Sequence, residues 1–128
     1  MDLKIVDFGI FGTNKVNNPE KSNAGSLKYM PPEVLIGYNE STPKIDVWAL
    51  GIILYSLLMG NYPFRSSNRE ELKKQIIEKE IYFNKKDRKL SENCKNILLK
   101  MLEKDPVKRI GVSEMLDHPW LSAYRQVK

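Results

Sequence analysis

The stretch PKIDVWALGIILYSLLMG, residues 43–60, decides the fold of this chain. Pro43 suits the first turn of a helix, and Thr42 before it is a candidate capping residue. Apolar side chains cover almost every face of the helix up to Met59, which is typical of a helix buried on all sides. Gly60 then suits the left-handed residue that ends a helix. The sequence therefore predicts a central helix over 43–59 that requires a larger body around it.

Capping residues and apolar spacing predict shorter helices around this centre. Two prolines stiffen the chain before a helical turn over 33–36, which ends near Gly37. Three more helices are expected to begin at the capping residues Asn68 (with Glu71 completing a capping box), Ser91 and Ser113. The last of them is expected to end at Pro119. The fold class that follows is mainly α.

The N-terminal part of the chain has a different pattern. Leu3 and Ile5 fall on one face of a short strand over 3–6, which Asp7-Phe8-Gly9 follows. Residues 10–30 are rich in Gly, Asn and Ser and lack periodicity, and long irregular stretches of this kind are usually functional or mobile. The expected architecture is a helical body preceded by one short strand and an irregular segment.

Composition argues against a disordered chain, because 41% of the 128 residues are apolar. The net charge of +5 is spread along the sequence. The short basic cluster at 85–89 is interpreted as a solvated loop, with a nuclear signal or a polyanion-binding patch as the alternatives. The longest apolar run is too short to span a bilayer, so no membrane partner is expected. No nucleic-acid partner is expected either.

Two single residues limit the chemistry further. Cys94 is the only cysteine, so no disulfide within the chain and no cysteine pair for zinc is expected. A reducing compartment is the simpler expectation, and the predicted location is cytoplasmic, with the nucleus as the alternative. No secretory signal peptide is recognised at the start of the sequence. His118, the only histidine, is expected to pack within the fold, and a general base or metal ligand is the alternative.

Six motifs in a fixed order resemble the C-terminal lobe of serine/threonine protein kinases, especially the calmodulin-dependent and AMP-activated groups. They are Asp7-Phe8-Gly9, Gly25 to Glu33, Asp46 to Gly51, Gly60 to Phe64, Asp105 to Ile110, and His118 to Trp120. The resemblance implies a partial protein kinase domain over residues 1–124 and a C-terminal tail over 125–128. It also implies an enzyme that transfers the γ-phosphoryl group of ATP to serine or threonine of a protein substrate.

The resemblance assigns a metal and nucleotide role to the N-terminal turn. Asp7 is expected to hold Mg²⁺ that bridges the phosphates of ATP, because hard cations prefer oxygen ligands. Phe8 is expected to pack inward and fix the direction of Asp7, and Gly9 to allow the tight turn. ATP and Mg²⁺ are the expected cofactors of the complete kinase. The catalytic base of the family is not among these residues, so no catalytic residue is assigned.

The next segment is similar to the one in which kinases dock a peptide substrate. Ser26 is expected to approach the catalytic base, and the pocket for the residue after the phosphoacceptor is expected to be lined by Leu27, Tyr29 and Met30. Ser22 is a candidate for activation-loop phosphorylation, which orders a loop by charge capture, and a plain loop serine is the alternative. Protein substrates and a regulatory protein are the expected partners.

The same similarity assigns structural roles. Glu33 is expected to form a buried bidentate ion pair with Arg109. Asp46 is expected to accept hydrogen bonds from the backbone of the catalytic loop. Ser56 departs from the pattern, because kinases that favour basic substrates often carry glutamate at this place. An arginine-rich substrate is therefore not implied.

The 128 residues hold no glycine-rich loop, no Val-Ala-Ile-Lys strand and no His-Arg-Asp catalytic loop. We therefore expect the chain to be catalytically silent by itself and to expose an apolar patch beside its central helix. One alternative is a non-catalytic interaction module that binds a kinase, a regulator or a complementary fragment through the docking groove and the helix over 68–77. Another is that Met1 is an internal methionine of a longer kinase.

Overall fold

The computed structural model describes residues 27–38, 42–83 and 90–125, with side chains described as far as Ser122. Its helices are α3 (Pro32–Leu35), α4 (Pro43–Met59), α5 (Arg69–Glu78), α6 (Glu92–Met101), α7 (Val112–Asp117) and α8 (Pro119–Arg125). Within these ranges no strand occurs, which confirms the mainly helical fold. The strand predicted over 3–6 and the irregular segment as far as residue 26 lie outside the described residues.

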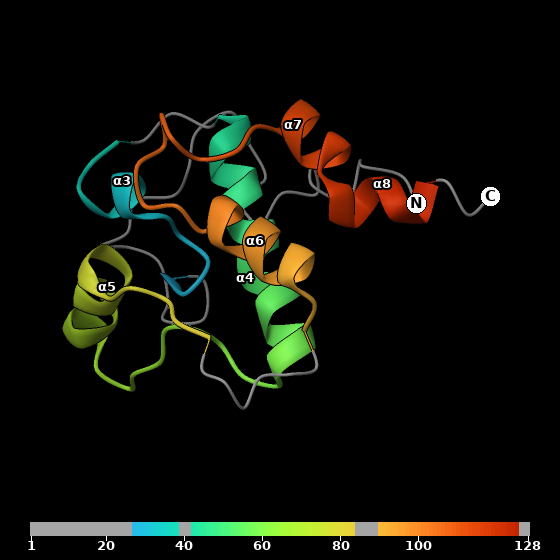
Figure 1. Ribbon diagram of the computed structural model, residues 1–128. Coiled ribbons are helices and arrows are strands. Elements are labelled where there is room, and N and C mark those ends of the chain that lie inside the picture. Colours follow the sequence, from blue (N-terminus) through green and yellow to red (C-terminus); the bar gives the residue numbers. More distant parts are fainter. Residues whose placement is uncertain (1–26, 39–41, 84–89, 126–128) are drawn as a thin grey trace.

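Helix α4 runs through the middle of the molecule, and α6 packs against it (Figure 1). Helices α3 and α5 lie together on one side, whereas α7 and α8 lie at the opposite end, where α8 also contacts α6. The predicted central position of α4 is therefore confirmed. None of the helices in the described ranges combines the length and the apolarity needed to cross a membrane.

The bounds of α4 follow from its terminal residues. Pro43 stands at the first helical position, where its missing N–H is harmless, and Gly60 ends the helix in the left-handed conformation with φ of 81°. Thr42 occupies the cap position as predicted, but its hydroxyl makes no capping hydrogen bond. The prediction that α4 is buried on all sides is wrong at its last turn. There Leu57 is 77% exposed and Leu58 is 39% exposed, because the described helices pack around the earlier turns.

The core gathers around the first turns of α4. Trp48 is fully buried and lies parallel to the ring of Phe64, with the ring centroids 6.0 Å apart. Gly51 lets α6 approach closely, since a Cβ there would lie 3.0 Å from Cβ of Met101 and 2.9 Å from a methyl group of Leu102. The larger core cluster surrounds Trp48, and a second one joins Val47 to Ile97, Met101, Ile110 and Met115.

The predicted capping residues of α5 and α6 are confirmed, but the capping box at Asn68 is not completed, because the N–H of Asn68 donates to Oγ of Ser66 over 3.0 Å instead of to Glu71. Oδ1 of Asn68 accepts a hydrogen bond of 3.0 Å from the backbone N–H of Glu71. Oγ of Ser91 accepts one of 3.1 Å from the N–H of Cys94. Each side chain satisfies an N–H that has no partner within its own helix.

The C-terminal helices differ from the prediction. The helix expected to open at Ser113 is capped by Gly111, whose N–H donates to the carboxylate of Glu114 over 3.3 Å. Pro119 was expected to end the last helix, but it also begins α8, because proline is well suited to a first helical position. His118 separates the two helices, with extended backbone at φ of −62° and ψ of 142°.

Candidate functional site

A buried ion pair anchors α3 to the loop that follows α6. Nη1 of Arg109 donates to Oε2 of Glu33 over 2.7 Å, and Nη2 donates to Oε1 over 2.8 Å. Arg109 is 1% exposed and Glu33 is 8% exposed. The predicted bidentate pair is therefore present, and its two parallel hydrogen bonds fix both the distance and the direction of α3.

The remaining donors of Arg109 are also used. Nε donates to the carbonyl of Glu103 over 2.7 Å, and Nη1 donates to the carbonyl of Lys44 over 2.9 Å. A longer bond of 3.4 Å joins Nη2 to the carbonyl of Lys104. The guanidinium carbon lies 5.1 Å from the ring centroid of Trp48. One side chain thus ties α3, the first turn of α4 and the loop after α6 together.

Lys44 reinforces the same junction from the other direction. Its Nζ donates to the carbonyl of Pro106 over 3.0 Å and to the carbonyl of Arg109. Arg109 and Lys44 therefore exchange bonds, each donating from its side chain to the backbone of the other. These hydrogen bonds hold the start of α4 and the segment around Arg109 together next to α3.

The segment from Leu27 to Met30 enters this framework as a tight turn. The N–H of Met30 donates to the carbonyl of Leu27 over 3.0 Å, and the side chains of both residues are fully buried. The part of the segment that reaches the surface is formed by Lys28 and Tyr29, which are half-buried. Of the residues predicted to line a docking pocket, the structure thus places Leu27 and Met30 in the core and Tyr29 at the rim.

Tyr29 meets Tyr62 from the loop after α4. Their hydroxyl oxygens are 3.1 Å apart, and their rings stand edge to face with centroids 6.0 Å apart. The hydrogen bond to Tyr62, followed by burial, raises the pKa of Tyr29 to about 12. The same hydrogen bond lowers the pKa of Tyr62, and the positive charge of Lys28 lowers it further. Either hydroxyl can be the donor in this contact.

The other predicted site residues are placed differently. Asp46 lies in the first turn of α4, and the hydroxyl of Ser56 donates to the carbonyl of Ile53 within the helix over 2.8 Å. Five predicted site residues lie outside the described residues, namely Asp7, Phe8, Gly9, Ser22 and Ser26. In the described part of the chain, no three side chains of the kinds that bind metals gather into a site.

His118 has a structural role that the sequence indicated only as packing. Its Nε2 lies 2.7 Å from Oδ1 of Asn96, and its Nδ1 accepts the N–H of Trp120 over 3.1 Å. The ring is therefore neutral with its hydrogen on Nε2, and it caps the start of α8. Burial lowers the pKa of His118, and the nearby charge of Lys100 lowers it further.

An apolar groove of about 640 Å³ lies beside the ion pair, and the sequence did not indicate it. Ile36 on its wall is 72% exposed and Val107 is 86% exposed. The charged residues that reach the groove are Glu33 and Lys44, both of which bond within the protein. The groove therefore presents exposed apolar side chains. Its full lining is Glu33, Ile36, Tyr38, Thr42, Lys44, Pro106 and Val107.

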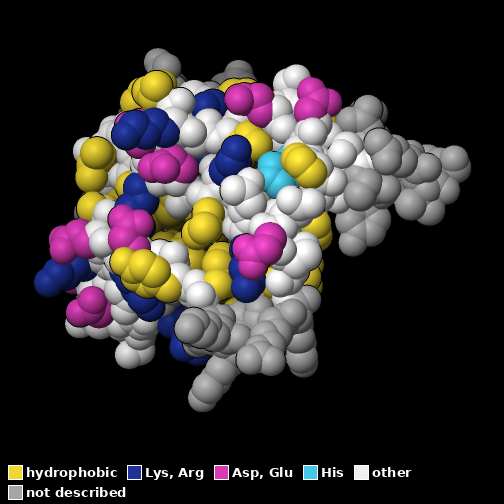
Figure 2. Space-filling view, viewed as in Figure 1, with side chains coloured by type: hydrophobic (Ala, Val, Ile, Leu, Met, Phe, Trp, Pro, Cys, Tyr) yellow, Lys and Arg dark blue, Asp and Glu magenta, His cyan; other side chains and the backbone are white. Residues whose placement is uncertain are grey.

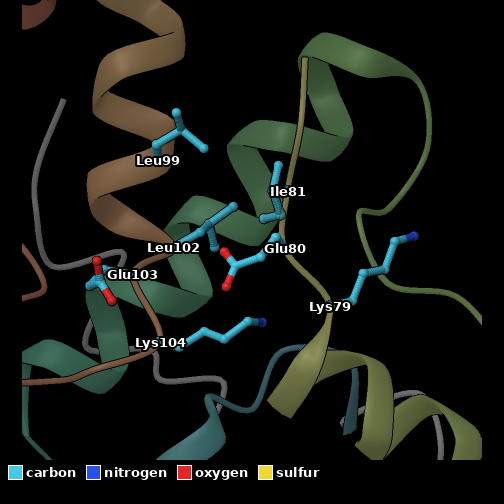
Figure 3. A pocket seen from close by; sticks show the side chains of 7 residues that line it. All are labelled: Lys79, Glu80, Ile81, Leu99, Leu102, Glu103 and Lys104. Atoms are coloured by element: carbon cyan, nitrogen blue, oxygen red, sulfur yellow. The ribbon is translucent and has the colours of Figure 1, made fainter. Parts of the chain in front are cut away.

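A smaller cavity of about 190 Å³ lies between the chain after α5 and the end of α6 (Figure 3). Hydrophobic side chains gather on this face of the molecule, bordered by acidic and basic ones (Figure 2). Lys104 on the cavity wall donates to the carbonyl of Ile76 over 2.6 Å, and its Nζ lies 4.7 Å from the ring centroid of Phe64. Lys79 points away from the other lining side chains in Figure 3. The ammonium of Lys104 thus links α5 to the core through the carbonyl of Ile76 and the ring of Phe64.

Comparison with known proteins assigns the chain to a family. The chain matches the protein kinase domain over residues 1–121. It is 35% identical over 126 residues to the serine/threonine-protein kinase SIK2 of Gallus gallus, covering 96% of this chain and 15% of the relative. It is 37% identical over 124 residues to the protein kinase kin1 of Schizosaccharomyces pombe, covering 94% of this chain and 13% of the relative.

A third relative agrees. The SNF-related serine/threonine-protein kinase of Homo sapiens is 33% identical over 119 residues, covering 93% of this chain and 15% of the relative. The chain thus spans about one seventh of the length of these curated relatives. The matched residues include the buried pair of Glu33 and Arg109 and the whole of α4. This chain belongs to the protein kinase domain family.

Proposed function

We propose that the chain is part of a serine/threonine protein kinase, which transfers the γ-phosphoryl group of ATP to a hydroxyl group of a protein substrate. The observation that carries the proposal is the kinase-domain match over residues 1–121, which covers both the Asp7-Phe8-Gly9 motif and the framework held by Arg109. Phosphoryl transfer depends on positioning and charge neutralisation more than on covalent chemistry. The hydrogen bonds of Arg109 hold α3, the start of α4 and the loop after α6 in fixed positions, which suits this requirement.

In the complete kinase, Asp7 is proposed to hold Mg²⁺ next to ATP, with Phe8 and Gly9 setting the direction of its carboxylate. The donor chemistry fits, because carboxylate oxygens are preferred Mg²⁺ ligands. Bound Mg²⁺ supplies charge neutralisation on the phosphates. One carboxylate is not a complete coordination shell, and the 128 residues contain no His-Arg-Asp loop. The reaction therefore requires residues outside this sequence, and the chain alone is expected to be inactive.

The docking role is proposed for the segment that ends at Glu33. The anchor with Arg109 supports this role, because it fixes the segment against α4 and leaves Lys28 and Tyr29 at the surface. Ser26, Leu27 and Met30 complete the proposed docking segment.

Two further roles are proposed for the complete kinase. Asp46 would orient the catalytic loop by accepting its backbone N–H groups, and Ser22 would be the residue that is phosphorylated in the activation segment. Phosphate on Ser22 would add charge that a basic side chain can capture.

A chimera tests the proposed reaction. We would replace the aligned segment of the SIK2 kinase domain by residues 1–121 and measure the transfer of phosphate from labelled ATP to a serine peptide. We expect activity in the chimera and a loss of at least ~100-fold in Asp7→Asn, because the metal ligand is removed. Asp2→Asn is the control and should retain activity. A chimera that folds but transfers no phosphate, or one in which Asp7→Asn has no effect, would contradict the proposal.

The apolar groove favours a second candidate function, a non-catalytic interaction module. Its exposed Ile36 and Val107 could bind an apolar segment of a partner. An apolar fluorescent dye should bind the chain and brighten, and the double variant Ile36→Ser and Val107→Ser should abolish most of the signal. Leu57→Ser, an equally exposed position on α4, is the control. Equal fluorescence of the double variant and the parent chain would remove the basis for this candidate.

A further inference from the structure

Lys28 holds its ammonium group over two aromatic rings at the rim of the proposed docking segment. Nζ lies 4.0 Å from the ring centroid of Tyr62 and 5.8 Å from that of Tyr29. Among the described residues, no carboxylate forms an ion pair with Lys28. A cation over an aromatic face is positioned without being neutralised, so the charge stays available to a ligand.

The hydroxyl of Tyr62 provides a second group beside this charge. The hydroxyl oxygens of Tyr29 and Tyr62 are 3.1 Å apart and either can be the donor, so in the arrangement in which Tyr29 donates, the hydrogen of Tyr62 can be given to a ligand. The hydrogen bond to Tyr29 and the positive charge of Lys28 both lower the pKa of Tyr62. An ammonium and a hydroxyl donor therefore adjoin, and together they suit a carboxylate.

The neighbouring residues favour the same chemistry. Leu27 and Met30 are fully buried, so the surface of residues 27–30 is formed by Lys28 and Tyr29. The surface of residues 27–30 thus carries a positioned cation.

We propose that Lys28 and the hydroxyl of Tyr62 form a specificity-determining site that takes an acidic side chain of the protein substrate, close after the phosphoacceptor. This inference rests on the proposed function, since the substrate must lie along residues 27–30. The ligand is the carboxylate of Asp or Glu. The rings of Tyr29 and Tyr62 position the ammonium before the substrate arrives, which lowers the entropy lost on binding.

Peptide binding to the full 128-residue chain tests the site. A labelled serine peptide carries Glu, Gln or Lys at each of the three positions after the serine in turn, and fluorescence anisotropy gives the Kd. At one position we expect Glu to bind ~5-fold more tightly than Gln, the upper range for an exposed ion pair, and Lys to bind more weakly than Gln. High salt should reduce the preference. No preference at any position, or no binding of any peptide, would overturn the proposal.

Variants assign the preference to Lys28. Lys28→Met should abolish it, Lys28→Glu should reverse it towards the Lys peptide, and Lys28→Arg should keep it. Tyr62→Phe should reduce it while leaving the salt dependence. Lys74→Met, at an exposed lysine of α5, is the matched control and should leave the preference unchanged. Equal melting temperatures would exclude unfolding as the cause, and a preference that survives Lys28→Met would contradict the assignment.

The outcomes separate this site from the proposed reaction. An inactive chimera with a preference that depends on Lys28 would overturn the kinase proposal and leave the acidic-ligand site standing. An active chimera that phosphorylates Glu, Gln and Lys peptides with equal kcat/KM would overturn the site alone.

Discussion

Glu33 and Arg109 lie 76 residues apart in sequence and meet through two parallel hydrogen bonds of 2.7 and 2.8 Å. Both groups are withdrawn from water, so each depends on the other for compensation of its lost hydration. The backbone carbonyls of Glu103, Lys44 and Lys104 complete the surroundings of the guanidinium. The pair thus holds the segment that ends at Glu33 in place and makes the fold sensitive to the loss of either partner.

Removing one partner of this pair should be strongly destabilising. Glu33→Gln and Arg109→Met should each lower the free energy of unfolding by about 3–5 kcal/mol, because one buried charge remains uncompensated. The double variant should lose less than the sum of the single variants. Urea unfolding followed by circular dichroism measures these values.

The control breaks a pair in which the carboxylate is exposed. Lys95 and Glu92 are 3.9 Å apart, and the side chain of Glu92 is 94% exposed, so Lys95→Met should cost less than about 1 kcal/mol. If Glu33→Gln costs no more than Lys95→Met, the anchoring role of the pair is wrong.

Acidification should destabilise the protein through His118. Burial and Lys100 hold the folded-state pKa of His118 below its ordinary value of 6.5, so the unfolded chain binds this proton more tightly. Its contribution to stability is therefore complete above pH 6.5 and declines as the pH falls through the folded-state pKa. Protonation of Nδ1 would also remove the acceptor for the N–H of Trp120.

Melting temperatures between pH 5 and pH 8 measure this effect, because His118 is the only histidine in the chain. His118→Asn keeps an acceptor at the start of α8 and does not titrate in this range. Its melting temperature should therefore vary less with pH than that of the parent chain. Equal slopes for the two proteins would show that another group is responsible.

Two glycines should respond to alanine for different reasons. Gly51→Ala should cost about 1–3 kcal/mol despite the better helix propensity of alanine, because the new Cβ meets Met101 and Leu102. Gly60→Ala meets no atom within 4 Å, but its φ of 81° should cost about 1 kcal/mol through backbone strain. Chemical denaturation measures both.

Replacing Leu102 by the smaller valine distinguishes the steric cost at Gly51 from the backbone strain at Gly60. Leu102→Val should partly relieve Gly51→Ala, so the double variant should be less destabilised than the sum of its parts. The same change should be additive with Gly60→Ala, which has no contact with Leu102. Additivity in both cases would contradict a steric role for Gly51.

Replacement by alanine should destabilise the protein to different extents at two helix N-cap positions. Asn68→Ala should cost about 1 kcal/mol, because the N–H of Glu71 loses its acceptor. Thr42→Ala should cost less than about 0.5 kcal/mol, because its hydroxyl makes no capping bond. Asn68→Asp retains an acceptor and serves as the control in thermal unfolding. A larger loss for Thr42→Ala than for Asn68→Ala would contradict these assignments.

Sequence reasoning succeeded where the cause is local or where the family pattern is specific. The ends of α4 and the caps Asn68 and Ser91 depend on residues within one helical turn, so the sequence contains their explanation. The pair of Glu33 and Arg109 was predicted from two motifs that resemble a kinase. Periodicity alone could not have joined residues so far apart.

Sequence reasoning failed where contacts between distant segments determine the local structure. Pro119 is compatible with both the end and the start of a helix, and the cap provided by His118 selects the start. The exposure of Leu57 depends on which elements cover the last turn of α4. The cluster of Lys28, Tyr29 and Tyr62 joins two loops whose contact has no signature in either sequence segment.

The separation of Glu33 from Arg109 also sets an order of events during translation. At typical elongation rates, Arg109 is synthesised roughly 4–15 s after Glu33, since 76 residues separate them. During an interval of that length, a nascent chain on the ribosome therefore has an unpaired carboxylate at Glu33 and a preceding segment that is not yet anchored. Chaperones that hold growing polypeptides would meet this kinase segment before its arginine has emerged.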